Sequence, residues 1–207
     1  MSLFDWILAG IVLIVVVYFS FILTLVDWLA ALKKGQAVTL LPERKGGTWP
    51  LWTQVAMVIL GLLLCVPLFY YLWIPIVKLA PITGRVLDIV GLIIFLAGCT
   101  FVLWARRILG KMWGLSTSQE VKLREDHQII QTGPYGFVRN PMYFGWWVVM
   151  LGLLLVYPTW VVLLFLVFSV VSFTGRAKRE DKALAERFGK GWAEYRKHTK
   201  FLIPFIY

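Results

Sequence analysis

The segment GPYGFVRNPMYFGWW, residues 133–147, carries the side chains best suited to chemistry in an otherwise apolar chain. Its Asn140-Pro141 step is typical of a helix start, with Asn as the N-cap and Pro as the first helical residue. The N-terminal end of a helix presents unpaired N–H groups and a partial positive charge. Because Arg139 adds a cation beside that end, the segment predicts a binding site for an anionic group.

Aromatic side chains flank this predicted anion site. Tyr135, Tyr143, Trp146 and Trp147 offer ring faces to an organic cation or a flat heterocycle. Together with the anion site they would suit S-adenosylmethionine, which has a carboxylate, a sulfonium and an adenine. The same residues are also typical of a cytoplasmic turn with an aromatic belt at the membrane surface. The residues alone leave both interpretations open.

A second candidate site lies in RAKREDKALAERFGKGWAEYRK, residues 176–197, which is predicted to continue the last membrane span as one helix. At about 100° per residue, Arg176 and Glu180 fall in line with an apolar stripe. An ion pair directed inwards at membrane depth is costly, so this pair is a catalytic candidate, with a structural bridge as the alternative. The opposite face would meet anionic headgroups. The stripe comprises Arg176, Glu180, Leu184, Phe188, Gly191 and Tyr195, and the basic face comprises Lys178, Arg179, Lys182, Lys190, Arg196 and Lys197.

The composition indicates which elements position these residues. The chain has 207 residues, of which 60% are hydrophobic and 15% are charged, and its mean hydropathy is +0.78. Such a chain is too apolar for an ordinary soluble domain and is typical of a multispanning membrane protein. The net charge of +10 then reflects basic cytoplasmic loops rather than nucleic-acid binding. Cys65 and Cys99 lie in apolar runs and are interpreted as packing residues, and no metal site is expected.

Uncharged runs predict an all-α fold with five membrane spans. The first begins near Asp5 and continues to Leu32, and we expect it to be a retained helix rather than a signal peptide. A proline starts a helix more readily than it continues one, so Pro158 divides the last apolar run into a tight hairpin of two short spans. The other predicted spans are about 50–76, 85–109, 141–156 and 159–175.

Lysines and arginines predict the orientation. Four of them follow the first span, six lie between the third and fourth spans, and nine lie from Arg176 to Lys200, whereas only Lys78 and Arg85 lie between the second and third spans. The N-terminus is therefore expected outside, and both candidate sites in the cytoplasm. We expect residues 1–84 to form an N-terminal membrane part, and residues 85–207 to form the catalytic half.

Several pieces of the second half, in order, resemble one known family. EDHQIIQTGPYGFVRNPMYFG, an apolar hairpin and RAKREDKALAERFGKGWAEY followed by FLIP are similar to the isoprenylcysteine carboxyl methyltransferases and the related phospholipid methyltransferases. ARRILGKMW, residues 105–113, also resembles the start of that family's catalytic half. The resemblance covers about residues 100–205. It implies an integral membrane methyltransferase that uses S-adenosylmethionine and releases S-adenosylhomocysteine.

The resemblance also implies residue roles. The family's methyl donor binds at positions that match the segment from His127 to Ile130, partly through the backbone, and at positions that match Tyr135 and Asn140 to Tyr143. The arginine that matches Arg176 faces the methyl acceptor, and the glutamate that matches Glu180 faces the donor. The full set expected to contact the donor is Glu120, His127, Gln128, Ile129, Ile130, Gly133, Tyr135, Arg139, Asn140, Pro141, Met142, Tyr143 and Glu180.

The chain departs from the family pattern at two positions. Asn140 stands where the family usually has histidine, and an asparagine can cap and hydrogen-bond but cannot carry charge or act as a base. Any role that needs an imidazole there is therefore in doubt. Glu120 matches its family position only loosely, and a solvated glutamate is the alternative.

The expected reaction is carboxyl O-methylation of an isoprenylcysteine-type, lipid-like acceptor that approaches from the bilayer. Methylation of a phospholipid amine or of a small thiol is the alternative, and there Glu180 would be the nearest base. A membrane reductase that uses a nicotinamide cofactor also stays open, because sterol-reductase-type enzymes have a similar C-terminal half. A channel or transporter is disfavoured, because the predicted spans contain few polar residues.

Overall fold

The computed structural model describes residues 2–23, 25–26, 29, 50–110 and 128–206. Within these ranges the secondary structure is helical, apart from two isolated β-bridges. The chain divides into two compact units, Met1–Leu68 with Leu115–Gln119 and Phe69–Gly114 with Glu120–Tyr207. Every candidate site residue that the structure describes belongs to the second unit.

The first unit begins with α1, Leu3–Val17. A capping box starts this helix: the Ser2 side chain accepts from the Asp5 N–H at 3.3 Å, and the Ser2 N–H donates to the Asp5 carboxylate at 2.6 Å. The helix passes into a π-helical turn, η1, Tyr18–Ile22. The helix α3, Leu51–Leu72, begins in this unit, contains Pro67 and ends four residues before the predicted end of the second span.

The second unit contains three long helices, α4 (Pro81–Leu109), α5 (Pro141–Val156) and α6 (Trp160–Phe188). A short helix, α7 (Lys190–His198), and a 3₁₀ turn, η3 (Gly133–Gly136), complete it. The helix α4 begins one turn before its predicted start because Pro81 occupies a first-turn position, where its missing N–H costs nothing. The predicted hairpin is confirmed, since α5 ends at Val156 and α6 begins at Trp160.

Backbone hydrogen bonds from a distant segment hold the α5–α6 turn. The Ile76 N–H donates to the carbonyl oxygen of Pro158 at 2.8 Å, and the Trp160 N–H donates to that of Ile74 at 3.1 Å. An antiparallel bridge joins Pro75 and Thr159 between them. Because backbone polar groups near an apolar phase need partners, this pairing stabilises a turn that lies at the end of two apolar helices.

Glycines allow α4 and α5 to approach closely. A Cβ atom at Gly152 of α5 would lie 2.4 Å from the backbone nitrogen of Phe95, and one at Gly98 of α4 would lie 2.7 Å from the backbone nitrogen of Val149. One heptad away on each helix, a Cβ at Gly91 would lie 2.8 Å from the carbonyl oxygen of Gly152, and one at Gly145 would lie 2.6 Å from the Val102 side chain. Small residues at this spacing are typical of helix interfaces in membranes. This interface fixes α5, whose first turn carries site residues.

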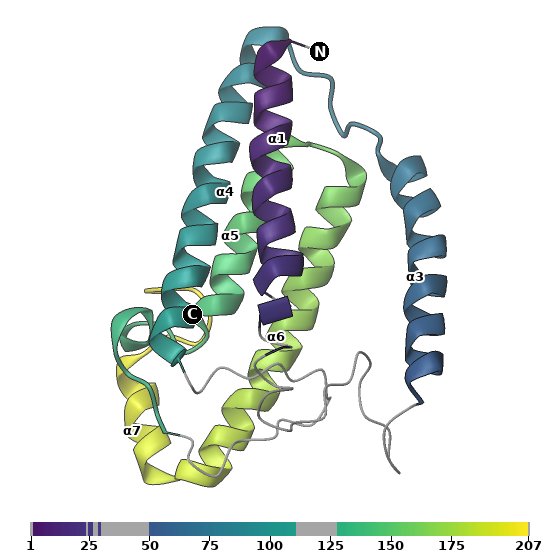
Figure 1. Cartoon of the computed structure of the whole chain (residues 1–207). Coiled ribbons are helices and arrows are strands. Elements are labelled where there is room, and N and C mark those ends of the chain that lie inside the picture. Colours follow the sequence, from purple (N-terminus) through teal and green to yellow (C-terminus); the bar gives the residue numbers. More distant parts are fainter. Residues whose placement is uncertain (1, 24, 27–28, 30–49, 111–127, 207) are drawn as a thin grey trace. The chain divides into compact units, whose positions relative to one another are not determined.

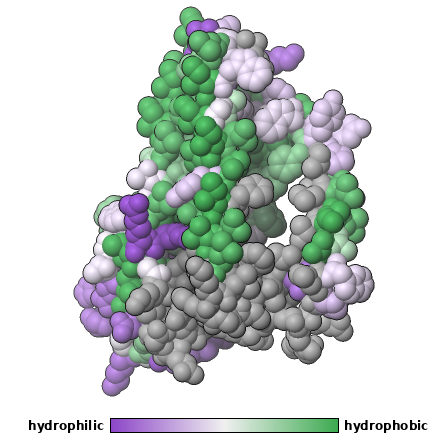
Figure 2. Space-filling model, viewed as in Figure 1, coloured by the Kyte–Doolittle hydropathy of each residue, from purple (hydrophilic) through white to green (hydrophobic). Residues whose placement is uncertain are grey.

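Among the residues that the structure describes, two helices, α4 and α6, are long and apolar enough to cross a membrane, and α1 and α5 are shorter apolar helices. In Figure 2, hydrophobic residues cover much of the position of α4, and hydrophilic ones appear toward its lower end and around the position of α7. Large apolar side chains of α6 also face outwards, among them Leu164, Phe165, Val167, Phe168 and Val171. Such exposure suits lipid contact and would be costly in water.

The prediction of one continuous helix after the last span is wrong at Gly189. This glycine adopts a φ of 50°, ends α6 and precedes α7, so the chain turns between the two helices (Figure 1). A glycine after the last helical residue is a common C-terminal signal, because it enters left-handed conformations without a Cβ clash. As a result Arg176 and Glu180 lie on α6, whereas Gly191 and Tyr195 lie on α7 and do not continue the same stripe.

Candidate active site

The loop before α5 is packed against the end of α4. Its η3 turn is closed by hydrogen bonds from the Tyr135 N–H to the Thr132 carbonyl at 3.2 Å and from the Val138 N–H to the Pro134 carbonyl at 3.1 Å. Gly133 has a φ of 59°, and a Cβ there would lie 3.0 Å from the Ile108 side chain of α4. Pro134, Tyr135 and Val138 are buried. The loop is therefore an ordered segment that packs against α4.

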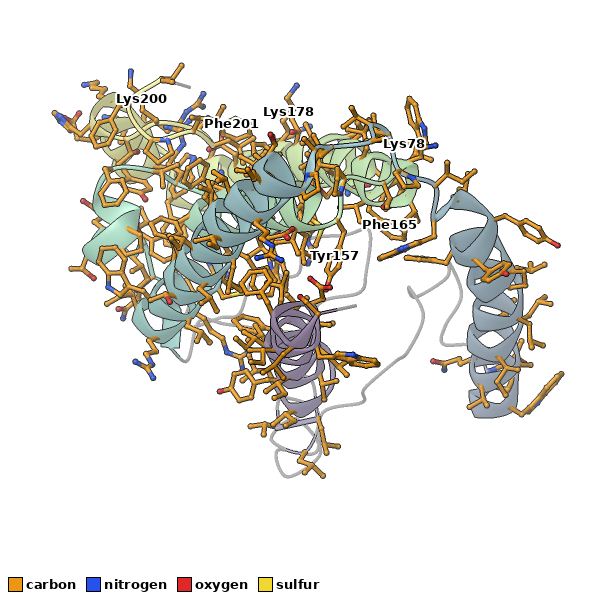
Figure 3. The ribbon with its side chains drawn as sticks, turned by 90° about the horizontal axis from the view of Figure 1, so that it is seen from above. Lys78, Tyr157, Phe165, Lys178, Lys200 and Phe201 are labelled. Atoms are coloured by element: carbon orange, nitrogen blue, oxygen red, sulfur yellow. The ribbon has the colours of Figure 1, made fainter. Side chains whose placement is uncertain are left out.

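The C-terminal tail pairs with this loop. Val138 and Lys200 form a parallel bridge, in which the Arg139 N–H donates to the Lys200 carbonyl at 2.8 Å and the Lys200 N–H donates to the Phe137 carbonyl at 3.0 Å. Figure 3 shows Lys200 and Phe201 near each other at the same end of the unit. Leu202, two residues after Lys200, is 1% exposed and anchors the tail in the core.

Arg139 is engaged inside the protein, and its predicted role as a fixed cation beside an anionic ligand stays a prediction. Its Nε donates to Oδ1 of Asp181 on α6 at 3.1 Å, and Nη1 donates to the carbonyl oxygens of Thr199 at 2.6 Å and Arg196 at 3.4 Å. The side chains of Arg139 and Asp181 are only 8% and 13% exposed. Burial lowers the pKa of Arg139, and the charge of Asp181 acts in the opposite direction.

Asn140 occupies the N-cap position of α5, and Pro141 follows as predicted, but the asparagine side chain does not cap the helix. Its Nδ2 donates instead to the carbonyl oxygen of Phe201 at 3.0 Å. The backbone of Asn140, with φ −123° and ψ 57°, directs the amide to the tail rather than to the first-turn N–H groups. The amide thus extends the loop–tail pairing that begins at Val138.

The predicted ion pair of α6 is confirmed, and a tyrosine of α5 joins it. Arg176 Nε lies 3.0 Å from Glu180 Oε1, and the Tyr143 hydroxyl donates to the same oxygen at 2.7 Å. The Tyr143 ring stacks on Phe173 with 5.2 Å between centroids. The side chains of Arg176 and Glu180 remain 37% and 26% exposed. This cluster therefore joins α5 to α6 and still presents charged groups at the surface of the unit.

Two buried tyrosines connect α7 to the loop. The Tyr195 hydroxyl donates to the backbone carbonyl of Tyr135 at 2.6 Å, and the Thr199 hydroxyl donates to the Tyr195 carbonyl at 2.7 Å. Burial raises the pKa of both phenols, so each hydroxyl stays protonated at neutral pH. The Tyr195 hydroxyl can therefore donate its hydrogen bond. Because Tyr135 is only 8% exposed, its ring offers little free face to a ligand, contrary to the sequence-based expectation.

The remaining expected donor residues lie at the start of the loop or outside the described residues. Glu120 and His127 belong to the range 111–127, which the structure does not describe. Gln128 is exposed, and Ile129 and Ile130 are half-buried; the Ile129 side chain lies 3.6 Å from the Cβ position of Gly191 on α7. Met142 is half-buried in the first turn of α5.

A small hollow of about 120 Å³ lies between the loop and α7. Pockets that hold whole cofactors commonly measure roughly 300 to 1,000 Å³, so this hollow would hold only part of such a molecule. It is lined by Gln131, Gly136, Gly191, Glu194, Tyr195, His198 and Thr199.

Two indole N–H groups test whether the site suits a polar ligand. Those of Trp147 and Trp192 are buried and have no hydrogen-bond partner among the described residues. Trp147 lies one turn after Tyr143 on α5, on the face that meets Glu180. An unmet buried donor is costly, and beside Tyr143 the partly exposed carboxylate of Glu180 offers an acceptor to a cationic group. The cluster of Tyr143 and Glu180 therefore fits a ligand that carries a cationic group.

Sequence reasoning missed Asp181, Thr199 and Phe201, whose side-chain or backbone oxygens hold Arg139 and Asn140. One signal was present for Asp181, which directly follows Glu180 on the same part of α6. No local sequence pattern indicates Thr199 and Phe201, because they contribute backbone carbonyl groups, which every residue has.

Comparisons with known proteins agree with this architecture. Residues 86–191, half of the chain, match the family model described as phospholipid methyltransferase. The chain is 34% identical over 117 residues to the protein-S-isoprenylcysteine O-methyltransferase of Saccharomyces cerevisiae, an alignment that covers 53% of this chain and 48% of that protein. It is 29% identical over 118 residues to the steroid 5-alpha-reductase DET2 of Solanum lycopersicum, which covers 57% of this chain and 42% of that protein. The chain thus spans about half the length of the curated relatives it matches.

A solved structure has the same fold. The eukaryotic intramembrane Ras methyltransferase, isoprenylcysteine carboxyl methyltransferase, superposes with a TM-score of 0.52 at 20% identity, over 78% of this chain and 58% of that one. That neighbour is an intramembrane enzyme, and two helices within the described residues of this chain are long and apolar enough to span a bilayer. The resemblance inferred from the sequence is confirmed, and the chain belongs to the phospholipid methyltransferase family.

Proposed function

We propose that this chain is a multispanning membrane methyltransferase that uses S-adenosylmethionine to methylate the carboxylate of an isoprenylcysteine-type acceptor. The cluster of Tyr143, Glu180 and Arg176 carries the proposal, because it places a carboxylate and a guanidinium where apolar helices α5 and α6 meet the polar loop. We further propose five spans, an outside N-terminus and a cytoplasmic site. Basic residues that flank the predicted spans support this orientation.

The proposed roles follow from the charges of the cluster. When bound, S-adenosylmethionine would supply an electrophilic methyl group and depart as S-adenosylhomocysteine. Arg176 would hold the acceptor carboxylate, which is already ionised at neutral pH and needs no general base. Glu180 would contact the donor, and the Tyr143 hydroxyl would fix the orientation of that carboxylate. Positioning and exclusion of water would then contribute most of the catalysis.

The loop residues would complete the donor site. Backbone groups of Gln128 to Ile130 would meet the donor from the side of α7, against which Ile129 lies. The N–H groups in the first turn of α5 remain the proposed site for the donor carboxylate. Because Arg139 is held by Asp181, its contribution to that anion site would be indirect.

Methyl transfer to defined acceptors tests the proposal. The purified chain in lipid nanodiscs would receive S-adenosylmethionine labelled in the methyl group and S-farnesylcysteine. We expect label in a base-labile methyl ester. Label in phosphatidylethanolamine or in a small thiol instead would assign the reaction to the alternative acceptors, and no transfer to any of them would refute the proposed function.

Two substitutions test the assigned roles. Arg176→Ala should abolish turnover and leave binding of S-adenosylhomocysteine nearly unchanged, because the arginine would act on the acceptor. Glu180→Gln should also weaken binding of that ligand, because it removes the carboxylate charge that would contact the donor. Lys182→Ala is the matched control, since Lys182 lies on the same helix and its side chain is 80% exposed. Full activity in both site variants would contradict the assignment.

A nicotinamide-dependent reductase is the second candidate, because the similarity to a steroid reductase covers 57% of the chain. Calorimetry with NADPH and S-adenosylhomocysteine separates the two activities. Tight binding of NADPH without a response to the adenosyl ligand would favour the reductase. Cysteine-accessibility labelling tests the proposed topology. A single cysteine placed near residue 190 should react with thiol reagents that cross the membrane to the cytoplasm, and it should not react with reagents that stay outside.

A further inference from the structure

We propose that Arg139 and Asp181 form a latch that positions the donor-binding loop by fastening it to α6 and to the C-terminal tail. The inference rests on the proposed function for the meaning of the donor site, but the latch itself is a feature of the described contacts. Arg139 touches three segments at once: its own loop through the backbone, α6 through Asp181, and the end of α7 through the carbonyl groups of Arg196 and Thr199.

The geometry distinguishes this arrangement from an ordinary surface ion pair. The Nε···Oδ1 distance is 3.1 Å, and the two side chains are 8% and 13% exposed. By comparison, the pair of Lys182 and Glu186 on the same helix has a distance of 3.8 Å and exposures of 80% and 69%. An exposed pair contributes little to structure. A buried arginine that also satisfies two carbonyl oxygens holds its partners in one arrangement.

The latch works together with two neighbouring bonds. The Asn140 amide donates to the Phe201 carbonyl, and the loop and tail pair through Val138 and Lys200. Arg196 also lies 3.7 Å from the second oxygen of Asp181, so one carboxylate serves both the loop and α7. These contacts surround Asn140, the N-cap of α5, three positions before Tyr143. The latch therefore sets where the first turn of α5, with its proposed anion site, lies relative to Glu180.

Asp181→Asn is the most informative variant, because it keeps the volume and an acceptor oxygen but removes the charge that faces Arg139. Arg139→Lys keeps the charge and loses the fork of donors. Glu186→Gln is the matched control, an equal change of charge at an exposed carboxylate of α6. Hydrogen exchange measured by mass spectrometry reports the latch without any need for activity.

In Asp181→Asn and Arg139→Lys, we expect faster exchange in residues 133–140 and 199–206, and wild-type exchange in residues 91–105 of α4. We also expect the KM for S-adenosylmethionine and the Kd for S-adenosylhomocysteine to rise about tenfold or more, with a smaller change in kcat, since misplacement of binding groups by about 1 Å has large effects. The double variant should behave like either single one, because the two residues act as a unit.

Glu186→Gln should match the wild type in every measurement. Unchanged exchange in both loop and tail of the two latch variants would overturn the latch. Faster exchange with unchanged donor KM and Kd would overturn its positioning role. If the wild type binds no adenosyl ligand, the proposed function fails, whereas the exchange measurement still decides whether the pair holds loop and tail together.

Discussion

Replacement of Gly152 by alanine should separate α4 from α5 and destabilise the protein. The added Cβ would lie 2.4 Å from the nitrogen and 2.7 Å from the Cα of Phe95, and both are backbone atoms of the facing helix. A side chain could rotate away, but these atoms can yield only if a whole helix moves. Overpacking of this kind costs about 3 kcal/mol, the upper end of the usual range.

Alanine also gains helix propensity over glycine, by about 1 kcal/mol. The net loss is therefore about 2 kcal/mol, which corresponds to a decrease in Tm of roughly 4 to 8 °C for a chain of this size. Gly84→Ala is the control in α4 itself, because a Cβ there meets nothing within 4 Å. That variant should gain the propensity without the clash, so its Tm should stay unchanged or rise by about 1 to 4 °C.

Thermal unfolding of the purified protein in detergent, followed by tryptophan fluorescence, measures both variants. The expected shifts have opposite signs although the substitution is the same. If Gly152→Ala were as stable as the wild type, the close approach of α4 and α5 would not be a constraint, and the reasoning would fail. Because α5 also carries Tyr143, the displacement of α5 in Gly152→Ala should decrease methyl transfer as well.

Two further predictions concern single hydroxyl groups. Tyr143→Phe removes one hydrogen-bond donor from Glu180, and a hydrogen bond to a charged group contributes about 1.5 to 3 kcal/mol. Methyl transfer should therefore fall by about tenfold or more, while circular dichroism should show an intact fold. Wild-type rates would show that the hydroxyl does not orient the carboxylate. Tyr195→Phe removes the bond to the Tyr135 carbonyl, which should decrease the free energy of unfolding at neutral pH by about 1 kcal/mol. Burial raises the pKa of the Tyr195 hydroxyl above its usual value of 10.0, so the folded chain holds this proton up to a higher pH than the unfolded chain does. The contribution of this proton to the free energy of unfolding is therefore complete below pH 10.0 and decreases above it. Melts recorded from about pH 8 to pH 11 should show a flatter alkaline decline in Tyr195→Phe, and an unchanged slope would contradict this assignment.

Features that depend on neighbours in the chain could be predicted from the sequence. The hairpin turn follows from Pro158 in the middle of an uncharged run, and Pro141 starts α5 because its missing N–H costs nothing there. The pair of Arg176 and Glu180 follows from helical periodicity, which brings residues four apart to one face. Gly189 was an available signal for the end of α6, and the assumption of one continuous helix overlooked it.

The partners of the loop could not be predicted in this way. Arg139 looked like an open cation because its neighbours in the sequence provide no carboxylate, yet Asp181 lies 42 positions later and meets it across the fold. Asn140 looked like a helix cap, and its amide reaches instead a carbonyl oxygen 61 positions away. Backbone carbonyl groups carry no sequence signature, so no pattern could reveal that the tail would bind there.

The sequence by itself determined that the chain is an apolar helical protein with a helix start at Pro141, a hairpin turn at Pro158 and a pair of Arg176 and Glu180 on α6. Each of these depends on interactions over a few residues, where periodicity, proline geometry and burial in an apolar phase leave few alternatives. Only the tertiary structure decided that Arg139 binds Asp181 and the tail, and that Tyr143 joins Glu180. The physical reason is that the turn at Gly189 and the close α4–α5 packing set these distances, and the residues involved lie far apart along the chain.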